Sequence, residues 1–131
     1  MATAGAPQVQ PQGFPVAVKV ARVDVGGEPT DIIASKYEDG LLLVVSQIGA
    51  FGTVLRARPD ASAEGRTTYS TSVLLGRRDE PLLTLAARQL VEAAVEGGYT
   101  RPLTVTLGLK HHTLEAVKQL VAAVKEQGLL R

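Results

Sequence analysis

The sequence predicts an α+β fold in two layers, in which an antiparallel sheet of about six strands carries two helices on one face. Stretches of alternating apolar and polar residues, separated by short turns, fill the chain as far as residue 75. Helical periodicity begins after Gly76, and one further alternating stretch lies between two helical ones. Because both helices are amphipathic, each must bury an apolar stripe, and the sheet offers the nearest apolar surface.

Five segments before Gly76 are expected to be strands, namely residues 16–25, 29–37, 41–48, 51–58 and 67–75. The turns between the first segments contain glycine, which accepts the positive φ that tight hairpins require. These short connections predict that the first four strands form an antiparallel meander. Within the fourth segment, Arg56 and Arg58 alternate with smaller or apolar residues and should share one side of the strand.

The helical part of the chain has recognisable boundaries. Asp79 is expected to be the N-cap of the first helix, with Glu80 and Pro81 in its first turn. Residues 103–109 alternate and predict a sixth strand, and Thr113 is expected to cap the second helix. Glycines follow the first helix and favour its termination there.

Length and composition limit the possible classes of protein. The 131 residues suit one domain, which we place at residues 16–131, after a proline-rich stretch at 1–15 that we expect to be a disordered leader. The net charge of +1 argues against a dedicated nucleic-acid binder. The chain has no cysteine, and its longest apolar run is far shorter than the roughly 20 residues of a membrane span. We therefore expect no nucleic-acid or membrane partner and a location in the cytosol or nucleus.

No residue set suggests catalysis or metal binding. His111 and His112 are adjacent, so their side chains point in different directions and would not easily share a metal ion. Ser46, Ser70 and Ser72 lie in strand patterns and not in the turn that exposes a nucleophilic serine. We expect a protein that is not an enzyme and that needs no cofactor.

The central strand predicts an interface. Residues 41–45 are all leucine or valine, whereas a strand with one wet face should alternate. Since the helices cover one face, the other face must meet water or protein. The expected contact residues on this open face, through which the chain would dimerise, are Leu42, Val44, Phe51, Val54 and Leu74. The alternative is that a loop or the leader covers this face, and the pattern leaves open which strand parity faces the helices.

Glycines mark the turns of the predicted sheet. Gly49, Gly52 and Gly76 are interpreted as residues that define turns, because glycine adopts backbone conformations that other residues disfavour. The spacing of Gly49 and Gly52 also matches the short loops of some RNA-binding domains. A small RNA-binding domain, or another protein-interaction domain without catalysis, is therefore the alternative function.

Two stretches resemble a known family. LLLVVSQIGAFGT at residues 41–53 resembles the V-x-Q-x-G-x-x-G-T hairpin of the proteasome assembly chaperone 3 family, and TSVLLGRRDEP at 71–81 resembles its VLLG…DEP strand-to-helix junction. VGGEPTD upstream is similar to the first hairpin of that family, so the resemblance covers residues 16–124. The chain departs from the family in its longer leader, in the additional Arg77 and Arg78, and in a basic, alanine-rich last helix.

The resemblance implies a function. Members of this family pair with a homologous assembly chaperone, the fourth of the set, and the heterodimer binds alpha-type proteasome subunits. It promotes assembly of the alpha ring of the proteasome core particle and leaves before the particle matures. The resemblance implies no catalysis and no cofactor, and it leaves open whether the isolated chain forms a homodimer.

Overall fold

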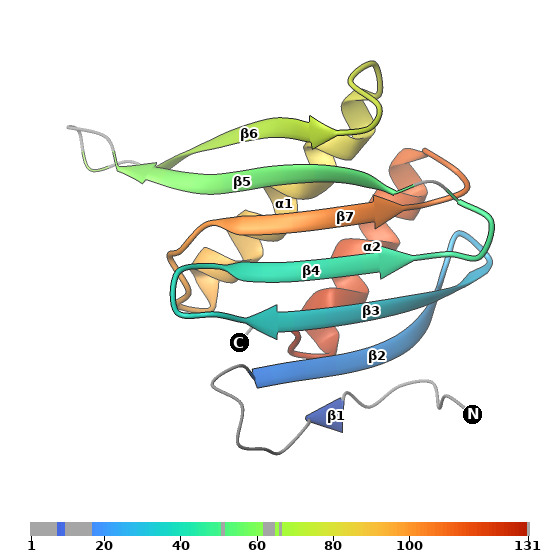
Figure 1. Ribbon diagram of the computed structural model, residues 1–131, viewed down its shortest axis with the longest axis horizontal. Helices are drawn as coiled ribbons and strands as arrows, with labels where there is room; N and C mark the ends of the chain where they lie inside the picture. The colour runs from blue at the N-terminus through green and yellow to red at the C-terminus, as the bar shows by residue number, and fades with distance from the viewer. Residues whose placement is uncertain (1–7, 10–16, 51, 62–64, 66, 131) are drawn as a thin grey trace.

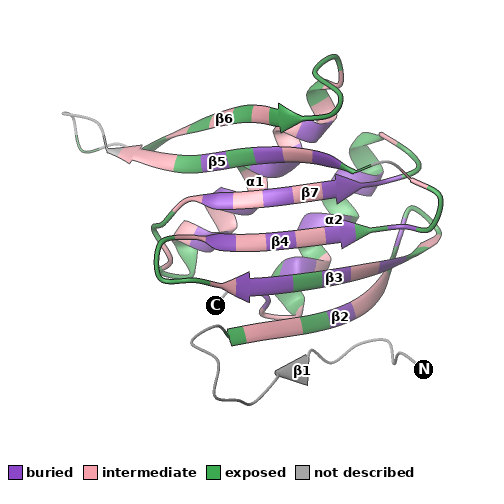
Figure 2. Ribbon diagram, in the orientation of Figure 1, coloured by how far each residue is buried: buried purple, intermediate pink, exposed green. Residues whose placement is uncertain are grey.

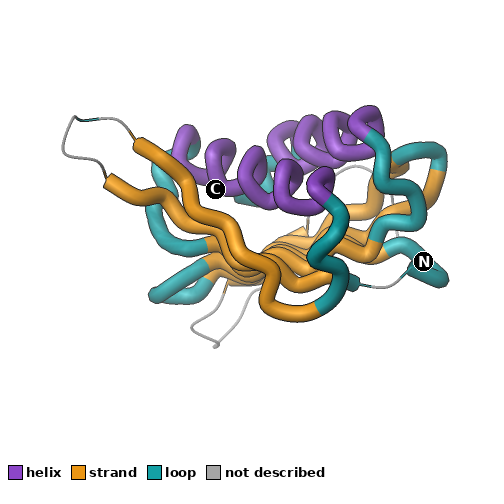
Figure 3. Tube along the Cα trace, turned by 90° about the horizontal axis from the view of Figure 1, so that it is seen from above, coloured by secondary structure: helices purple, strands orange, loops and turns teal. Residues whose placement is uncertain are grey.

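The computed structural model describes residues 8–9, 17–50, 52–61, 65 and 67–130. The fold has two layers, a twisted mixed sheet and two helices (Figure 1). Both helices lie on the same face of the sheet, as the view from above shows (Figure 3). The predicted α+β class, with two helices on one sheet face, is therefore confirmed.

The described elements are β1 (Gln8–Val9), β2 (Ala17–Val25), β3 (Glu28–Lys36), β4 (Leu41–Ser46), β5 (Thr53–Ala61), β6 (Thr67–Leu75), α1 (Pro81–Glu96), β7 (Leu103–Gly108) and α2 (Leu114–Glu126). Within the predicted leader, Gln8 and Val9 form a short strand that pairs antiparallel with β2, which composition did not indicate. The rest of that leader lies outside the described residues.

The sheet order is β1-β2-β3-β4-β7-β5-β6, and this order corrects the predicted meander. Strands β2, β3 and β4 are antiparallel neighbours as expected. Strand β5 does not pair with β4, because β7 lies between them, parallel to β4 and antiparallel to β5. The sheet is therefore mixed and not wholly antiparallel. A central place suits β7, whose Leu103, Val105 and Leu107 are completely buried.

The core lies between the helices and one face of the sheet. Leu41, Leu43 and Val45 of β4 point into it, which settles the parity that the sequence left open. Figure 2 shows buried and less buried residues alternating along β4 and β7. The fully buried side chains of the helices are Leu83, Ala86, Ala87, Leu90, Val91 and Ala94 of α1 and Val117, Leu120 and Val124 of α2. Burial of these apolar stripes holds the two layers together.

The connection from β4 to β5 crosses the end of β7. A Cβ atom at Gly52 would lie 2.8 Å from Cγ2 of Thr106 in β7, closer than real Cβ contacts come. Gly49 has a φ of +83°, a conformation that other residues rarely adopt. The two glycines are therefore needed, but for a chain that passes over β7 and not for the tight hairpin that we predicted.

A buried glutamine fixes the start of this crossing. Gln47 is 4% exposed, and its Nε2 donates hydrogen bonds to the Val25 carbonyl at 3.1 Å and to Thr30 Oγ1 at 2.9 Å. Its Oε1 accepts a hydrogen bond from the Lys110 backbone N–H at 2.8 Å. One amide thus joins the β2–β3 hairpin to the loop between β7 and α2. Buried polar groups left without such partners would be costly.

The two stretches that carry the family resemblance meet at Thr53. A Cβ atom at Gly76, which has a φ of +112°, would lie 2.8 Å from Thr53 Oγ1 and 2.9 Å from Thr53 Cα. The same Oγ1 accepts a hydrogen bond from the Arg77 backbone N–H at 3.2 Å. Gly76 therefore lets the end of β6 approach the start of β5.

Replacing the buried glutamine should destabilise the fold. We expect Gln47→Ala to lower the free energy of unfolding by about 2–4 kcal/mol, because it removes three hydrogen bonds that join the β2–β3 hairpin to the loop after β7. Gln119→Ala is the matched control, since Gln119 is exposed and water can replace its hydrogen bond to the Gly26 N–H. Urea denaturation measures both. Equal losses for the two variants would show that the buried hydrogen bonds of Gln47 do not stabilise the fold.

The contact at Gly76 can be separated from backbone strain. Gly76→Ala should cost about 2 kcal/mol more in unfolding free energy than Gly98→Ala. Gly98 also has a positive φ, +97°, but a Cβ there would have no atom within 4 Å. Thermal unfolding of both variants checks this difference. If Gly98→Ala proves as damaging as Gly76→Ala, close packing against Thr53 is not the cause.

Candidate protein-binding face

The side chains that point away from the helices form the open face of the sheet. Strand register aligns six of them in one line across β2, β3, β4, β7, β5 and β6: Val20, Ile33, Val44, Thr106, Val54 and Leu75. We call this line the apolar row, because every member except Thr106 is aliphatic. Val20, Ile33 and Leu75 are 41%, 38% and 69% exposed. The row is therefore a largely aliphatic surface that neither described helix covers.

The neighbouring line of residues on the open face is apolar in one half and polar in the other. It consists of Val18, Ser35, Leu42, Thr104, Arg56 and Ser72, in the order of the strands from β2 to β6. Its first half places Val18 and Leu42 beside the apolar row. Its second half is a polar corner, where Arg56 lies between hydroxyl groups. The open face thus has an apolar centre and one cationic corner.

The predicted interface residues fall largely on this surface. Leu42, Val44 and Val54 are half-buried and lie on the open face, so the structure brings them together. Leu74 is 50% exposed and lies where the register between β5 and β6 shifts. Phe51 lies outside the described residues. Whether this surface binds a partner stays a prediction.

Val20, Ile33 and Leu75 of the apolar row were not among the predicted interface residues. Val20 belongs to a strand whose apolar residues change face along its length, since Val18 and Val20 lie on the open face whereas Val25 is in the core. Leu75 is opposite Val54 only because the bulge shifts the register by one residue. The run of leucines before Gly76 was the available signal for Leu75, but its face depends on that shift.

At one edge of the face, the junction to α1 differs from expectation by one residue. Glu80, and not Asp79, is the N-cap: its Oε1 accepts a hydrogen bond from the Leu82 N–H at 3.3 Å. The helix begins at Pro81, and a residue before proline disfavours the helical conformation, so Glu80 is extended. Asp79 instead contacts Arg77 at 3.4 Å, and this hydrogen bond lowers the pKa of the Asp79 carboxyl.

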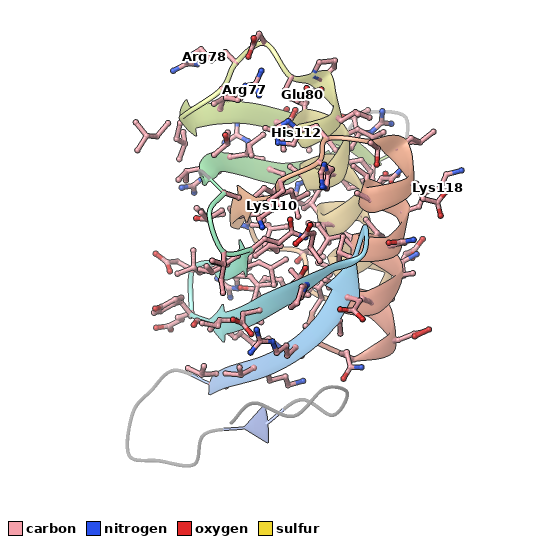
Figure 4. All side chains as sticks on the ribbon, turned by 90° about the vertical axis from the view of Figure 1, so that its right-hand side faces the viewer. Arg77, Arg78, Glu80, Lys110, His112 and Lys118 are labelled. Atoms are coloured by element: carbon pink, nitrogen blue, oxygen red, sulfur yellow. The ribbon has the colours of Figure 1, made fainter. Side chains whose placement is uncertain are left out.

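The histidines at this end have separate partners. His112 Nδ1 lies 3.5 Å from Oε2 of the capping Glu80 (Figure 4). His111 Nε2 and Lys110 Nζ instead approach the carboxylate of Glu28, at 3.7 Å and 3.4 Å. In the described ranges, no three histidine, aspartate or glutamate side chains lie close enough together to hold a metal ion. No described helix is long and apolar enough to cross a membrane. The most extensive candidate surface is therefore the open face.

Comparison with known sequences identifies relatives along most of the chain. A family model described as proteasome assembly chaperone 3 matches residues 43–127. The Bos taurus proteasome assembly chaperone 3 is 33% identical over 103 residues, which cover 77% of this chain and 84% of that protein. The protein of the same name from Nematostella vectensis is 32% identical over 111 residues, covering 77% of this chain and 81% of the relative.

A solved structure shows the same fold at low sequence identity. A chain from the crystal structure of a chaperone complex for yeast 20S proteasome assembly superposes with a TM-score of 0.64 and 11% identity. The match covers 87% of this chain and 98% of that one. The family model and the similarity to the bovine protein, together with this fold, establish that the chain belongs to the proteasome assembly chaperone 3 family.

Proposed function

We propose that this proteasome assembly chaperone pairs through its open face with a homologous assembly chaperone, and that the heterodimer promotes assembly of the alpha ring. The heterodimer and its action on the alpha ring are inferred from the family and from the chemistry of the open face. The similar yeast chain comes from a chaperone complex, which supports a partner of related shape. We expect the pair to act in the cytosol or nucleus, without a catalytic step.

The apolar row is the observation that carries this proposal. It spans six strands, and its outer members Val20, Ile33 and Leu75 are exposed in the single chain. Monomeric proteins rarely leave a large contiguous apolar surface in water. A second sheet stacked about 10 Å away would bury the row between two layers of side chains. Hydrophobic burial would then supply most of the stability of the pair.

The rim of the sheet suits weaker contacts with alpha-type subunits. Arg77 and Arg78 are exposed in the loop between β6 and α1, and Lys118 is exposed on α2 in the helical layer (Figure 4). Exposed charges contribute little to affinity and are screened by salt, but they speed up encounter and select orientation. A contact of this kind can be undone, as a chaperone that leaves the growing particle requires.

The RNA-binding alternative has no specific feature in its favour. Gly49 and Gly52, which suggested it, are both accounted for by the path of the chain over β7. The nearby Lys110 points toward Glu28, and its Nζ lies 3.4 Å from Oε1 of that carboxylate. A cation paired in this way is a poor phosphate ligand.

A charge in the centre of the apolar row should break the pairing. Val44→Asp should weaken binding of the homologous assembly chaperone by about 100-fold or more, because a carboxylate would be buried without a partner. The measurement is recovery of that chaperone and of alpha-type subunits with the tagged chain from extract of its own cells. Ala122→Asp is the control, since it adds the same charge on the exposed side of α2.

Either part of the proposal can fail in this experiment. Undiminished recovery of the chaperone by Val44→Asp, with thermal unfolding unchanged, would show that pairing uses another surface. Absence of every proteasomal protein from the wild-type recovery, with a discrete homodimer in light scattering, would contradict the assembly function. Mature core particle should be missing from a successful recovery, since the chaperone leaves before maturation.

A further inference from the structure

We propose that β1 is an edge cap: Gln8 and Val9 pair with β2 and thereby prevent another β-strand from pairing with the same edge of the sheet. The inference goes beyond the proposed function, because it concerns the edge of the sheet and not its open face. The occupant of the edge is residues 8–9 of this same chain. In a solution of the pure protein, the strand that the cap excludes is that of a second copy.

The cap lies alongside β2 at one edge of the sheet (Figure 1). The two strands are antiparallel, with Gln8 opposite Val20 and Val9 opposite Lys19. On its other side, β2 pairs with β3 along its whole length. Without β1, β2 would therefore be the outermost of the described strands. Such a strand presents backbone N–H and C=O groups with which another chain can pair.

The half of β2 that pairs with β1 lacks the usual protection of an edge strand. Natural edges are often protected by proline or by charged side chains, above all by lysine. Residues 17–21 contain no proline, and Lys19 is their one charged residue. Its Nζ donates a hydrogen bond to the carbonyl of Gly128 at 2.9 Å, so the ammonium group is held against the chain that follows α2. A covering strand is needed here because no side chain of this half guards the edge.

The other half of β2 carries charged side chains. Arg22 and Asp24 alternate with valines, and Asp24 is exposed. Arg22 forms an ion pair with Asp31 of β3 at 3.6 Å. A strand that paired with this half would have to pass close to these charges, which disfavours regular pairing. The register of β1 does not extend to this half, so the cap lies where the charges are missing.

The opposite edge of the sheet, β6, is protected in a different way. The register between β5 and β6 shifts between Val54 and Leu55, and a bulge of this kind twists a strand away from a regular partner. Arg78 Nη1 also donates a hydrogen bond to the Val73 carbonyl of β6 at 3.0 Å, which places a charge beside the strand. Each outer strand of the sheet thus has a feature that opposes pairing, and at β2 that feature is β1.

The test changes Gln8→Pro and Val9→Pro together in the full chain, because proline cannot donate the backbone hydrogen bonds of a ladder. Thr3→Pro with Ala4→Pro is the matched control, since it adds two prolines outside β1. Both chains also carry Val44→Asp, which places a charge on the open face and opposes association there. In sedimentation, the β1 variant should self-associate about tenfold or more tightly than the control, because new backbone hydrogen bonds form between copies. Adding Val20→Lys should reverse this gain, since it supplies a lysine to the uncovered edge.

Hydrogen exchange at low concentration, without Val44→Asp, measures the pairing of β1 itself. Residues 17–21 should exchange faster in the β1 variant than in the control, whereas β3 should be unchanged. Equal exchange of residues 17–21 would show that β1 does not pair in solution and would overturn the inference. Faster exchange without tighter self-association would also overturn it, since β1 would then pair without excluding another strand. A gain in self-association that Val20→Lys does not reverse would do the same, because the copies would then meet through another surface.

Discussion

The position of β7 between β4 and β5 is the constraint on which the rest of the structure depends. The β2–β3–β4 group and the β5–β6 hairpin do not pair with each other, and β7 alone joins them into one sheet. Its Leu103, Val105 and Leu107 are completely buried against the helices. Without this strand the apolar row would be two separate patches, since the line from Val44 to Val54 passes through Thr106.

The insertion of β7 also explains the residues that carry the family resemblance. The chain between β4 and β5 has to cross the end of β7, so Gly52 passes close to Thr106 and Gln47 anchors the start of the crossing. Gly76 then brings the end of β6 against Thr53, beside the same crossing. The recognisable motifs are therefore requirements of the fold. Leu42 and Val44 of the first motif and Leu75 of the second also lie on the open face.

The apolar row would supply affinity that many apolar sheets could share, because hydrophobic burial is not directional. Selection among such partners would rest on polar and charged groups around the row, because a wrong partner leaves them buried without a counterpart.

By itself, the sequence determined the number and type of the main elements, the two helix stripes and the apolar character of the central strand. These follow from periodicity, which depends only on neighbours along the chain. Even the first helix cap was predicted within one residue; Glu80 replaces Asp79 because Pro81 keeps the preceding residue extended. Leu42, Val44 and Val54 could be chosen as surface candidates because they interrupt the expected alternation.

Only the tertiary structure decided the strand order, the parallel pairing of β4 with β7, and the face on which each residue of 41–45 lies. Strand pairing joins residues far apart in the chain, so local periodicity does not predict which strands are neighbours in the sheet. The apolar row depends wholly on that register. The sequence alone therefore did not show that Val20 and Leu75 belong to it. The surface through which we expect the chain to act is therefore a property of the assembled sheet, although the side chains that compose it follow from local sequence.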